Sequence, residues 1–305
     1  MKLVLPIAGK GTRMQPLTHT MHKALIPIVD KPVLAHIIDN VLETQGVEVS
    51  EIIFITGHLE EQIKQWAQKN YDVPLRFVKQ ETQNGTAHAI KLVKDYIDED
   101  MLVVFPDALF DADLEVIAEH QDKDGIIWTS EVEDARHFGV VAHDEDMLMT
   151  ELLEKPQDPP SNLVNIGLYY VKDYQSAFAM IDMLYAHEIK AKGEYNFPEA
   201  LDLMAKNGKQ ILVEPVEGWH DCGRPESTLQ TNKNYTERAG IESRSTIHED
   251  AVITNSTLFN CIVMKDARIT DSDLENSIVG PNSIIKHTKG VVFTGAQTRI
   301  NGKKN

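Results

Sequence analysis

The sequence of 305 residues is long for one domain and suits a large domain followed by a smaller one. Its formal net charge of −17 argues against a surface for nucleic acid or anionic membranes, and no stretch approaches the roughly 18 apolar residues of a membrane span. The N-terminus has no signal-peptide pattern and the two cysteines lack zinc-type spacing, so we expect a cytoplasmic protein with reduced thiols.

The first third of the chain alternates between strand-like and helix-like patterns. Short apolar runs typical of buried strands lie at 3–8, 51–56, 75–79 and 101–106. Amphipathic stretches lie between them, at 32–44, 59–68 and 86–97. This alternation predicts an α/β fold with a mostly parallel sheet and helices on both faces. Ligands of such sheets bind beyond the carboxyl ends of the strands.

A glycine-rich loop with a basic core follows the first strand-like run, at Gly9-Lys10-Gly11-Thr12-Arg13. Its glycines allow a tight turn whose N–H groups can point at an anion, and Arg13 adds a planar donor fork that suits phosphate. Lys23 supplies a second cation, whereas His19 and His22 lack the third ligand that zinc would need. The spacing fits neither a P-loop nor a dinucleotide fingerprint, so it predicts either a polyphosphate cradle or a plain surface turn.

The longer stretch favours the cradle. It reads Gly9-Lys10-Gly11-Thr12-Arg13-Met14-Gln15-Pro16-Leu17-Thr18, followed by Lys23-Ala24-Leu25-Ile26-Pro27. This pattern resembles the signature of the sugar-phosphate nucleotidyltransferases, in particular the glucose-1-phosphate thymidylyltransferase type, with Ala8 and Ala24 at positions where that signature has glycine and proline. The resemblance implies a Rossmann-like nucleotide-diphospho-sugar transferase fold. It also implies the following nucleotide-binding residues: Ala8, Gly9, Gly11, Thr12 and Arg13.

A second segment resembles the base-binding part of the same family. Gln80 carries two donors and an acceptor that could read the edge of a base, and Gly85 would let the base pack against backbone. Gly85 and Thr86 also suit the start of a helix, which is compatible with binding. Gln80 could pair with thymine or uracil, so the base stays open.

Two aspartates suit a magnesium ion. Asp107 follows the strand-like run 101–106 and therefore lies at the same sheet edge as the cradle, and Asp221 lies in Trp219-His220-Asp221-Cys222-Gly223. Mg²⁺ takes one or two protein carboxylates together with phosphate oxygens. Separately, each aspartate could be a turn residue or a helix cap. The family resemblance implies that the pair holds Mg²⁺, although the neighbours of both residues differ from the family's turns.

The middle of the chain mixes the two patterns less regularly. Strand-like runs lie at 125–132, 139–142, 148–153, 163–171 and 211–216. Helical patterns lie at 174–189, 197–205 and 225–238. Within this region Glu154-Lys155-Pro156 resembles the family's sugar-phosphate segment, since a lysine suits a phosphate monoester and a carboxylate accepts sugar hydroxyls. In isolation the two residues would be a surface ion pair. The resemblance implies a sugar-phosphate site formed by Gly139, Glu154, Lys155, Asn165, Lys192 and Glu194.

The composition changes after Gly240, where the helical period stops. Apolar residues then recur every 16 positions in two series, Ile247, Val263, Val279 and Ile253, Ile269, Ile285. This spacing resembles the hexapeptide-repeat coils of a short left-handed parallel β-helix, whereas ordinary hairpins give no reason for a fixed period. We therefore expect a catalytic domain at 1–240 and a β-helix domain at 241–305. The tail is too short for a complete acyl-donor site, so we expect it to form a homo-oligomer.

These features together predict nucleotidyl transfer. The phosphate of a sugar 1-phosphate would attack the α-phosphorus of a nucleoside triphosphate, and pyrophosphate would leave. Arg13, Lys23 and Lys155 are the expected catalytic residues, with Mg²⁺ on the two aspartates. The first expectation is dTTP with glucose 1-phosphate, and the second is UTP. The alternative from another class is a catalytically silent regulatory subunit that binds sugar nucleotides.

Overall fold

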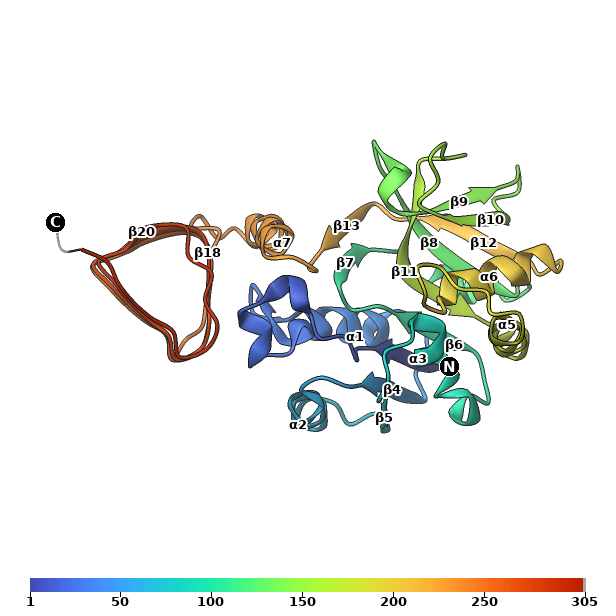
Figure 1. Ribbon diagram of the computed structural model, residues 1–305, viewed down its shortest axis with the longest axis horizontal. Coiled ribbons are helices and arrows are strands. Elements are labelled where there is room, and N and C mark those ends of the chain that lie inside the picture. The colour runs from blue at the N-terminus through green and yellow to red at the C-terminus, as the bar shows by residue number, and fades with distance from the viewer. Residues whose placement is uncertain (304–305) are drawn as a thin grey trace.

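The computed structural model describes residues 1–303, which form an α/β body and a C-terminal coil (Figure 1). The main sheet has nine strands, β1 (Lys2–Pro6), β4 (Glu51–Thr56), β5 (Leu75–Lys79), β6 (Met101–Val104), β8 (Gly125–Glu131), β9 (Gly139–His143), β10 (Met149–Glu154), β11 (Leu163–Val171) and β12 (Ile211–Pro215). Seven of them follow the order β10-β9-β11-β6-β1-β4-β5, and β8 joins β12 to β11.

The sheet is more evenly mixed than the sequence predicts. Strands β6, β1, β4 and β5 are parallel, as expected from the alternating pattern. Strand β11 runs antiparallel to β6, β8 and β9, and β10 runs antiparallel to β9, so four of the eight pairings are antiparallel. The parallel half carries the glycine-rich loop, and the antiparallel half carries the segment around Glu154.

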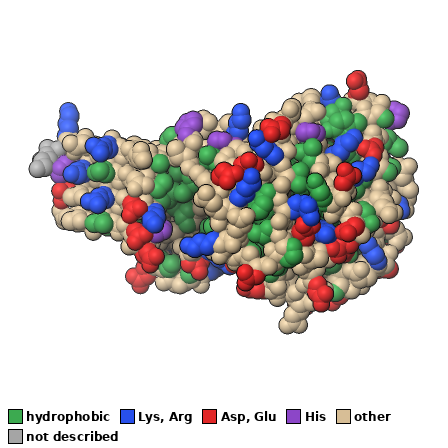
Figure 2. Space-filling model, turned by 90° about the horizontal axis from the view of Figure 1, so that it is seen from below, with side chains coloured by type: hydrophobic (Ala, Val, Ile, Leu, Met, Phe, Trp, Pro, Cys, Tyr) green, Lys and Arg blue, Asp and Glu red, His purple; other side chains and the backbone are tan. Residues whose placement is uncertain are grey.

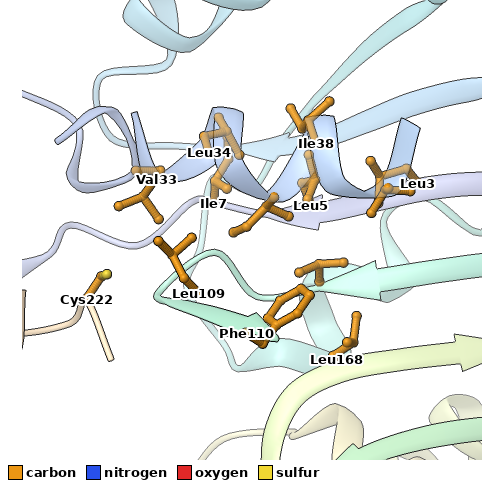
Figure 3. Close-up of a cluster of buried hydrophobic side chains, with 14 of the residues drawn as sticks. Leu3, Leu5, Ile7, Val33, Leu34, Ile38, Leu109, Phe110, Leu168 and Cys222 are labelled. Atoms are coloured by element: carbon orange, nitrogen blue, oxygen red, sulfur yellow. The ribbon is translucent and has the colours of Figure 1, made fainter. Parts of the chain in front are cut away.

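Helices cover both faces of the sheet, as predicted. They are α1 (Val33–Glu43), α2 (Glu60–Asn70), α3 (Thr86–Lys91), α4 (Val116–Glu119), α5 (Tyr174–Ala186), α6 (Phe197–Lys206) and α7 (Pro225–Arg238). Alternate side chains of β1 enter different cores, because successive residues of a strand point to opposite faces. Leu3 and Leu5 pack with α1 and α2, whereas Val4 packs with α3, α5 and α6. Figure 3 shows Leu3 and Leu5 facing the apolar side of α1.

One helix is shorter than predicted. The pattern favours a helix over 86–97, but α3 ends at Lys91 and a 3-10 turn, η4 (Lys94–Tyr96), follows it. Hydrogen bonds of the tighter 3-10 type begin between these elements, where the N–H of Val93 donates to the carbonyl oxygen of Ile90. Val93 and Ile97 are nevertheless buried. The tighter turn satisfies the same apolar spacing, which is why the periodic pattern did not reveal the change.

The coil follows α7 and lies at one end of the molecule (Figure 1). Its strands are β14 (Thr246–Ile247), β15 (Val252–Thr254), β16 (Thr257–Val263), β17 (Arg268–Thr270), β18 (Asp273–Val279), β19 (Ile284–Lys286), β20 (Lys289–Gly290) and β21 (Arg299–Asn301). They form two four-stranded sheets in which every pairing is parallel, so the hairpin alternative is wrong.

The register of the coil reproduces the period read from the sequence. Val263 is paired with both Ile247 and Val279, and Ile269 is paired with Ile253 and Ile285. Figure 1 looks along the coil and shows a triangular outline. Each apolar position therefore stacks on its counterpart one turn earlier, which explains why the spacing is constant.

The surface agrees with the composition. Figure 2 shows acidic and basic side chains mixed over the face that it presents. Among residues 1–303, no helix combines the length and the apolar run that a membrane crossing requires.

Candidate functional site

A cavity of about 840 Å³ brings many of the predicted residues together. Its walls come from the loop after β1, from both halves of the main sheet and from α6. Eight predicted site residues line it, namely Arg13, Thr86, Asp107, Gly139, Glu154, Lys155, Asn165 and Asp221. Residues from seven separate places in the sequence thus face one space. This is the arrangement expected of a site for a two-part substrate.

Two short strands that the sequence did not predict bring the aspartates together. Strand β7 (Ala108–Asp111) pairs antiparallel with β13 (Gly218–Asp221), with Asp221 opposite Ala108. The N–H of Cys222 donates to the carbonyl oxygen of Asp107 at 2.7 Å. Asp107 and Asp221 are therefore neighbours across this ladder, although they lie 114 positions apart in the sequence.

The donor set of this pair suits magnesium. Within the described residues, no three or more His, Cys, Asp or Glu side chains gather as a metal-binding group. Two carboxylates alone leave most positions of a Mg²⁺ ion to water and phosphate oxygens, which is how this ion is usually bound beside nucleotides. One oxygen of Asp221 accepts from the N–H of Gly223 at 3.0 Å, which fixes the orientation of the carboxylate.

The cysteine between these turns belongs to the core. Cys222 is buried and free, and Figure 3 places it near Leu109 and Val33. Burial raises the pKa of its thiol to about 12, so the thiol is neutral at physiological pH. Both cysteines are buried free thiols, as the sequence suggests.

The two predicted cations, Arg13 and Lys23, lie in the region of the two aspartates. A Cβ at Gly223 would lie 3.0 Å from an oxygen of Asp221 and 3.3 Å from Nη2 of Arg13, so both side chains flank this glycine. Lys23 does not line the cavity, but its Nζ lies 3.7 Å from Oδ2 of Asp107. Lys23 is thus paired with Asp107, and Arg13 and Asp221 both lie against Gly223.

The remaining residues of the predicted cradle shape the turn. Gly11 has a φ of 61°, in the left-handed region that favours glycine, and its carbonyl accepts from the hydroxyl of Thr18 at 2.7 Å. Thr12 begins the 3-10 turn η1 (Thr12–Met14), which carries Arg13 to the cavity. Ala8, Gly9, Gly11 and Thr12 are not among the cavity-lining residues, so their predicted contact with nucleotide stays a prediction.

His22 fastens the loop to the end of β1. One ring nitrogen contacts the carbonyl oxygen of Ile7 at 2.9 Å, and the other accepts from the N–H of Ala24 at 3.2 Å. Burial lowers the pKa of this imidazole to about 4, so the ring is neutral at pH 7 and donates to Ile7. Both nitrogens are engaged, which agrees with the expectation that His19 and His22 are not a zinc pair.

The predicted base-binding segment is tightly folded. Gln80 is only 7% exposed, and its amide donates to the carbonyl of Gly85 at 3.3 Å and lies 3.0 Å from His88. Gly85 has a φ of 95°, and a Cβ there would overlap the backbone of Tyr195. Thr86 begins α3 and lines the cavity, and its hydroxyl accepts from a backbone N–H at 2.8 Å. Gln80 and Gly85 are not among the residues that line the cavity, and their recognition of a base stays a prediction.

The opposite end of the cavity holds the predicted sugar-phosphate residues. Oε1 of Glu154 lies 3.5 Å from Nζ of Lys155 and 3.6 Å from Nζ of Lys192, so one carboxylate serves two lysines. A Cβ at Gly139 would lie 3.5 Å from the other oxygen of Glu154. Asn165 accepts from the N–H of Gly167 at 2.9 Å.

The turn that contains Lys192 and Glu194 lies at the margin of this end. Ala191 and Glu194 exchange backbone hydrogen bonds at 3.0 Å, and neither Lys192 nor Glu194 lines the cavity. Among residues 1–303, Lys192 forms its ion pair with Glu154 alone, and its side chain is 66% exposed.

Several ionisable residues of the cavity wall were not predicted from the sequence, among them Arg224 and Glu199. Arg224 directly follows the Asp221 turn and immediately precedes α7, and that position was the signal that could have revealed it. Glu199 lies in the first turn of α6, and its Oε2 is buried with no hydrogen-bond partner among the described residues. Burial, and to a smaller extent the negative charge of Glu154, raise the pKa of this carboxyl. No motif marked Glu199.

Known proteins are similar to this chain in sequence and in fold. A family model described as nucleotidyl transferase matches residues 2–238. The bifunctional protein GlmU of Methanocaldococcus jannaschii is 32% identical over 258 residues, which cover 85% of this chain and 60% of that protein. The UTP–glucose-1-phosphate uridylyltransferase AglF of Haloferax volcanii is 32% identical over 244 residues, which cover 78% of this chain and 97% of that protein.

A solved structure supports the architecture. A UDP-glucose pyrophosphorylase in complex with UDP-glucose matches with a TM-score of 0.67 at 24% identity, covering 78% of this chain and 98% of that one. The Rossmann-like α/β fold predicted for the body is thereby confirmed. The chain spans 60% of the length of the GlmU relative, so part of that protein has no counterpart in the match.

Proposed function

The chain belongs to the nucleotidyl transferase family, and we propose that it transfers a nucleotidyl group from a nucleoside triphosphate to a sugar 1-phosphate. The observation that carries this proposal is the single cavity that the phosphate loop and the Asp107–Asp221 pair share with Glu154 and Lys155. One end offers cations for a polyphosphate. The other offers a lysine and a carboxylate for a phosphorylated sugar.

The reaction needs charge and position more than acid–base chemistry. A phosphate oxygen of the sugar 1-phosphate forms a bond to the α-phosphorus, the bond from that phosphorus to the bridging oxygen breaks, and pyrophosphate leaves. The nucleophile is already an anion, so no general base is required. Arg13 would hold the β- and γ-phosphates and offset the charge of the leaving group, and Lys155 would hold the sugar phosphate in line.

Asp107 and Asp221 would hold a magnesium ion. Bound there, Mg²⁺ would neutralise charge on the triphosphate oxygens. Lys23 pairs with Asp107 and would keep that carboxylate turned toward the cavity while adding positive charge near the α-phosphate.

The names of the relatives change the order of the expected substrates. The loop resembles the thymidylyltransferase type, which favours dTTP. AglF is named for UTP and glucose 1-phosphate, and the matched pyrophosphorylase holds UDP-glucose, which favours uridine. We therefore propose UTP with glucose 1-phosphate first and dTTP with glucose 1-phosphate second.

The C-terminal coil is proposed to be a short left-handed parallel β-helix that begins near residue 241. Its two parallel sheets and 16-residue register support this assignment. We also propose that the coil joins copies of the chain, which light scattering would test through the mass of the particle in solution.

The activity is tested by pyrophosphate release with Mg²⁺, crossing UTP, dTTP, CTP, GTP and ATP with glucose 1-phosphate and other sugar 1-phosphates. Release that needs both one triphosphate and one sugar would establish the reaction and identify both substrates. No release from any pair, in folded protein that still binds nucleotide, would refute the proposal and favour the regulatory-subunit alternative.

A further inference from the structure

The phosphate loop has a second side, which faces the C-terminal coil. Arg13 lines the cavity, whereas Met14 and Leu17 are buried in a cluster with three residues of the coil, Ile262, Met264 and Ile278. The space that remains between the loop and the coil, bordered by Pro16 and Phe293, is only about 10 Å³. The loop and the coil thus share one buried cluster, in which the coil lies behind the loop.

At Gly295 the coil comes so close to the backbone of the loop that a side chain has no room. A Cβ at Gly295 would lie 2.9 Å from the carbonyl oxygen of Pro16, three residues after Arg13. The same carbonyl accepts from the N–H of His19 at 3.2 Å, so it is already fixed within the loop. The φ of Gly295 lies outside the left-handed region, so the neighbouring carbonyl rather than the backbone excludes a side chain there.

The coil cannot easily withdraw from this contact. The hydroxyl of Ser283 donates to the carbonyl of Gly295 at 2.9 Å, and the N–H of Gly280 donates to the hydroxyl of Thr294 at 2.9 Å. At its other end, the hydroxyl of Thr246 accepts from the N–H of Val29 at 2.7 Å and donates to Asn232 at 2.6 Å. The turn that carries Gly295 is therefore held by the rest of the coil, and the coil is hydrogen-bonded to the body through Thr246.

We propose that Gly295 is a positioning residue that holds Pro16, and through it Arg13, at the height that nucleotide binding requires. This inference rests on the proposed function. The coil borders the loop that carries Arg13, but as far as residue 303 it contributes no lining residue to the cavity that holds Glu154 and Lys155. A disturbance of the contact should therefore affect the nucleotide and leave the sugar 1-phosphate unaffected.

The test is Gly295→Ala, with KM measured separately for the two substrates. The added methyl must displace Pro16 by a few tenths of an ångström, and we expect kcat/KM for the triphosphate to fall about tenfold, because small misplacements of a binding group are costly. KM for the sugar 1-phosphate should stay at the wild-type value. The matched control is Gly290→Ala, which strains the coil at a φ of 97° but meets no atom within 4 Å. It should lower the melting temperature and leave both KM values unchanged.

Phe293→Ala provides a second test if Gly295→Ala does not fold. It removes coil atoms beside Pro16 without adding any, and it should show the same split between the two KM values to a smaller extent. Unchanged nucleotide kinetics in both variants, or equal changes in both KM values, would overturn the proposal. A wild-type protein without turnover would instead refute the proposed function. Calorimetric titration with the triphosphate would then still test the role of Gly295. Gly295→Ala should bind the triphosphate more weakly than the wild type, and Gly290→Ala should bind it as the wild type does.

Discussion

The two ends of the cavity are built in different ways. The nucleotide end depends on backbone contacts: His22 and the coil hold the phosphate loop, and the β7–β13 ladder holds the two aspartates together. The sugar end is formed by exposed ion pairs, in which Glu154 pairs with both Lys155 and Lys192. Exposed pairs contribute little stability, because solvent screens them and long side chains lose entropy on pairing.

This difference separates two tasks. Charge that develops at the α-phosphorus needs groups that are already in place, since preorganised electrostatic groups need no rearrangement during the reaction. A sugar can be recognised by side chains that adjust after it enters. We therefore expect changes at the nucleotide end to act on turnover, and changes at the sugar end to act on the KM of the sugar 1-phosphate.

The largest effect is expected from Arg13→Ala and Asp221→Ala. Each should lower kcat about a hundredfold or more, as the loss of one contact made in the transition state often does. Steady-state pyrophosphate release measures the change. Arg268→Ala and Asp250→Ala, both exposed in the coil, are the matched controls and should retain full turnover. Near-normal kcat in both site variants would refute the roles assigned to Arg13 and Asp221.

Lys155→Met should come next and should act on the other substrate. The change removes the charge and keeps the length, so the KM of the sugar 1-phosphate should rise about tenfold, the value of one charge-assisted hydrogen bond. The KM of the triphosphate should not move. Lys265→Met in the coil is the control. A larger loss in kcat than in sugar affinity would show that the sugar end also acts on the chemical step, and the contrast between the ends would fail.

The pH dependence of stability tests whether the nucleotide end is held from the buried side. His22 has a pKa near 4 when folded against an ordinary value of 6.5, so between these values only the unfolded chain binds the proton. Stability therefore falls as pH falls, by about 1 kcal/mol from His22 alone between pH 6.5 and 5.5.

The measurement compares urea unfolding of the wild type and His22→Gln at the two pH values. Other titrating groups are shared and cancel in the difference. The gap in unfolding free energy between the two proteins should narrow toward pH 5.5. A gap that is constant with pH would mean that the ring is not held neutral, and that His22 does not fix the loop.

The position of the phosphate loop and the period of the coil could be predicted from the sequence, for physical reasons. The phosphate loop is a local motif that directly follows β1, so the position of that strand determines where the loop lies. The coil repeats because each turn stacks on the last, and Val263 and Val279 had to recur in register. Both features depend on neighbours in sequence or on a fixed period.

The parts that could not be predicted depend on distant pairing. Strands β7 and β13 are four residues each and too short to show a period, yet their ladder is what places Asp107 beside Asp221. Glu199 reaches the cavity because α6 packs against β10, which no local pattern signals. The aspartates could be named from the sequence, but their proximity required the fold.

The smallest effect, and the sharpest comparison within the sugar end, is expected from Lys192→Met. Its side chain is 66% exposed, against 43% for Lys155, and within the described part of the chain it forms its ion pair with Glu154 alone. An exposed pair of this kind is worth less than about 1 kcal/mol, so the KM of the sugar 1-phosphate should rise about fivefold at most and kcat should not change. The KM should also become less sensitive to salt, because one screened charge has been removed. A tenfold rise, equal to that of Lys155→Met, would mean that the turn around Lys192 closes over the bound sugar and that the sugar end is ordered only by its ligand.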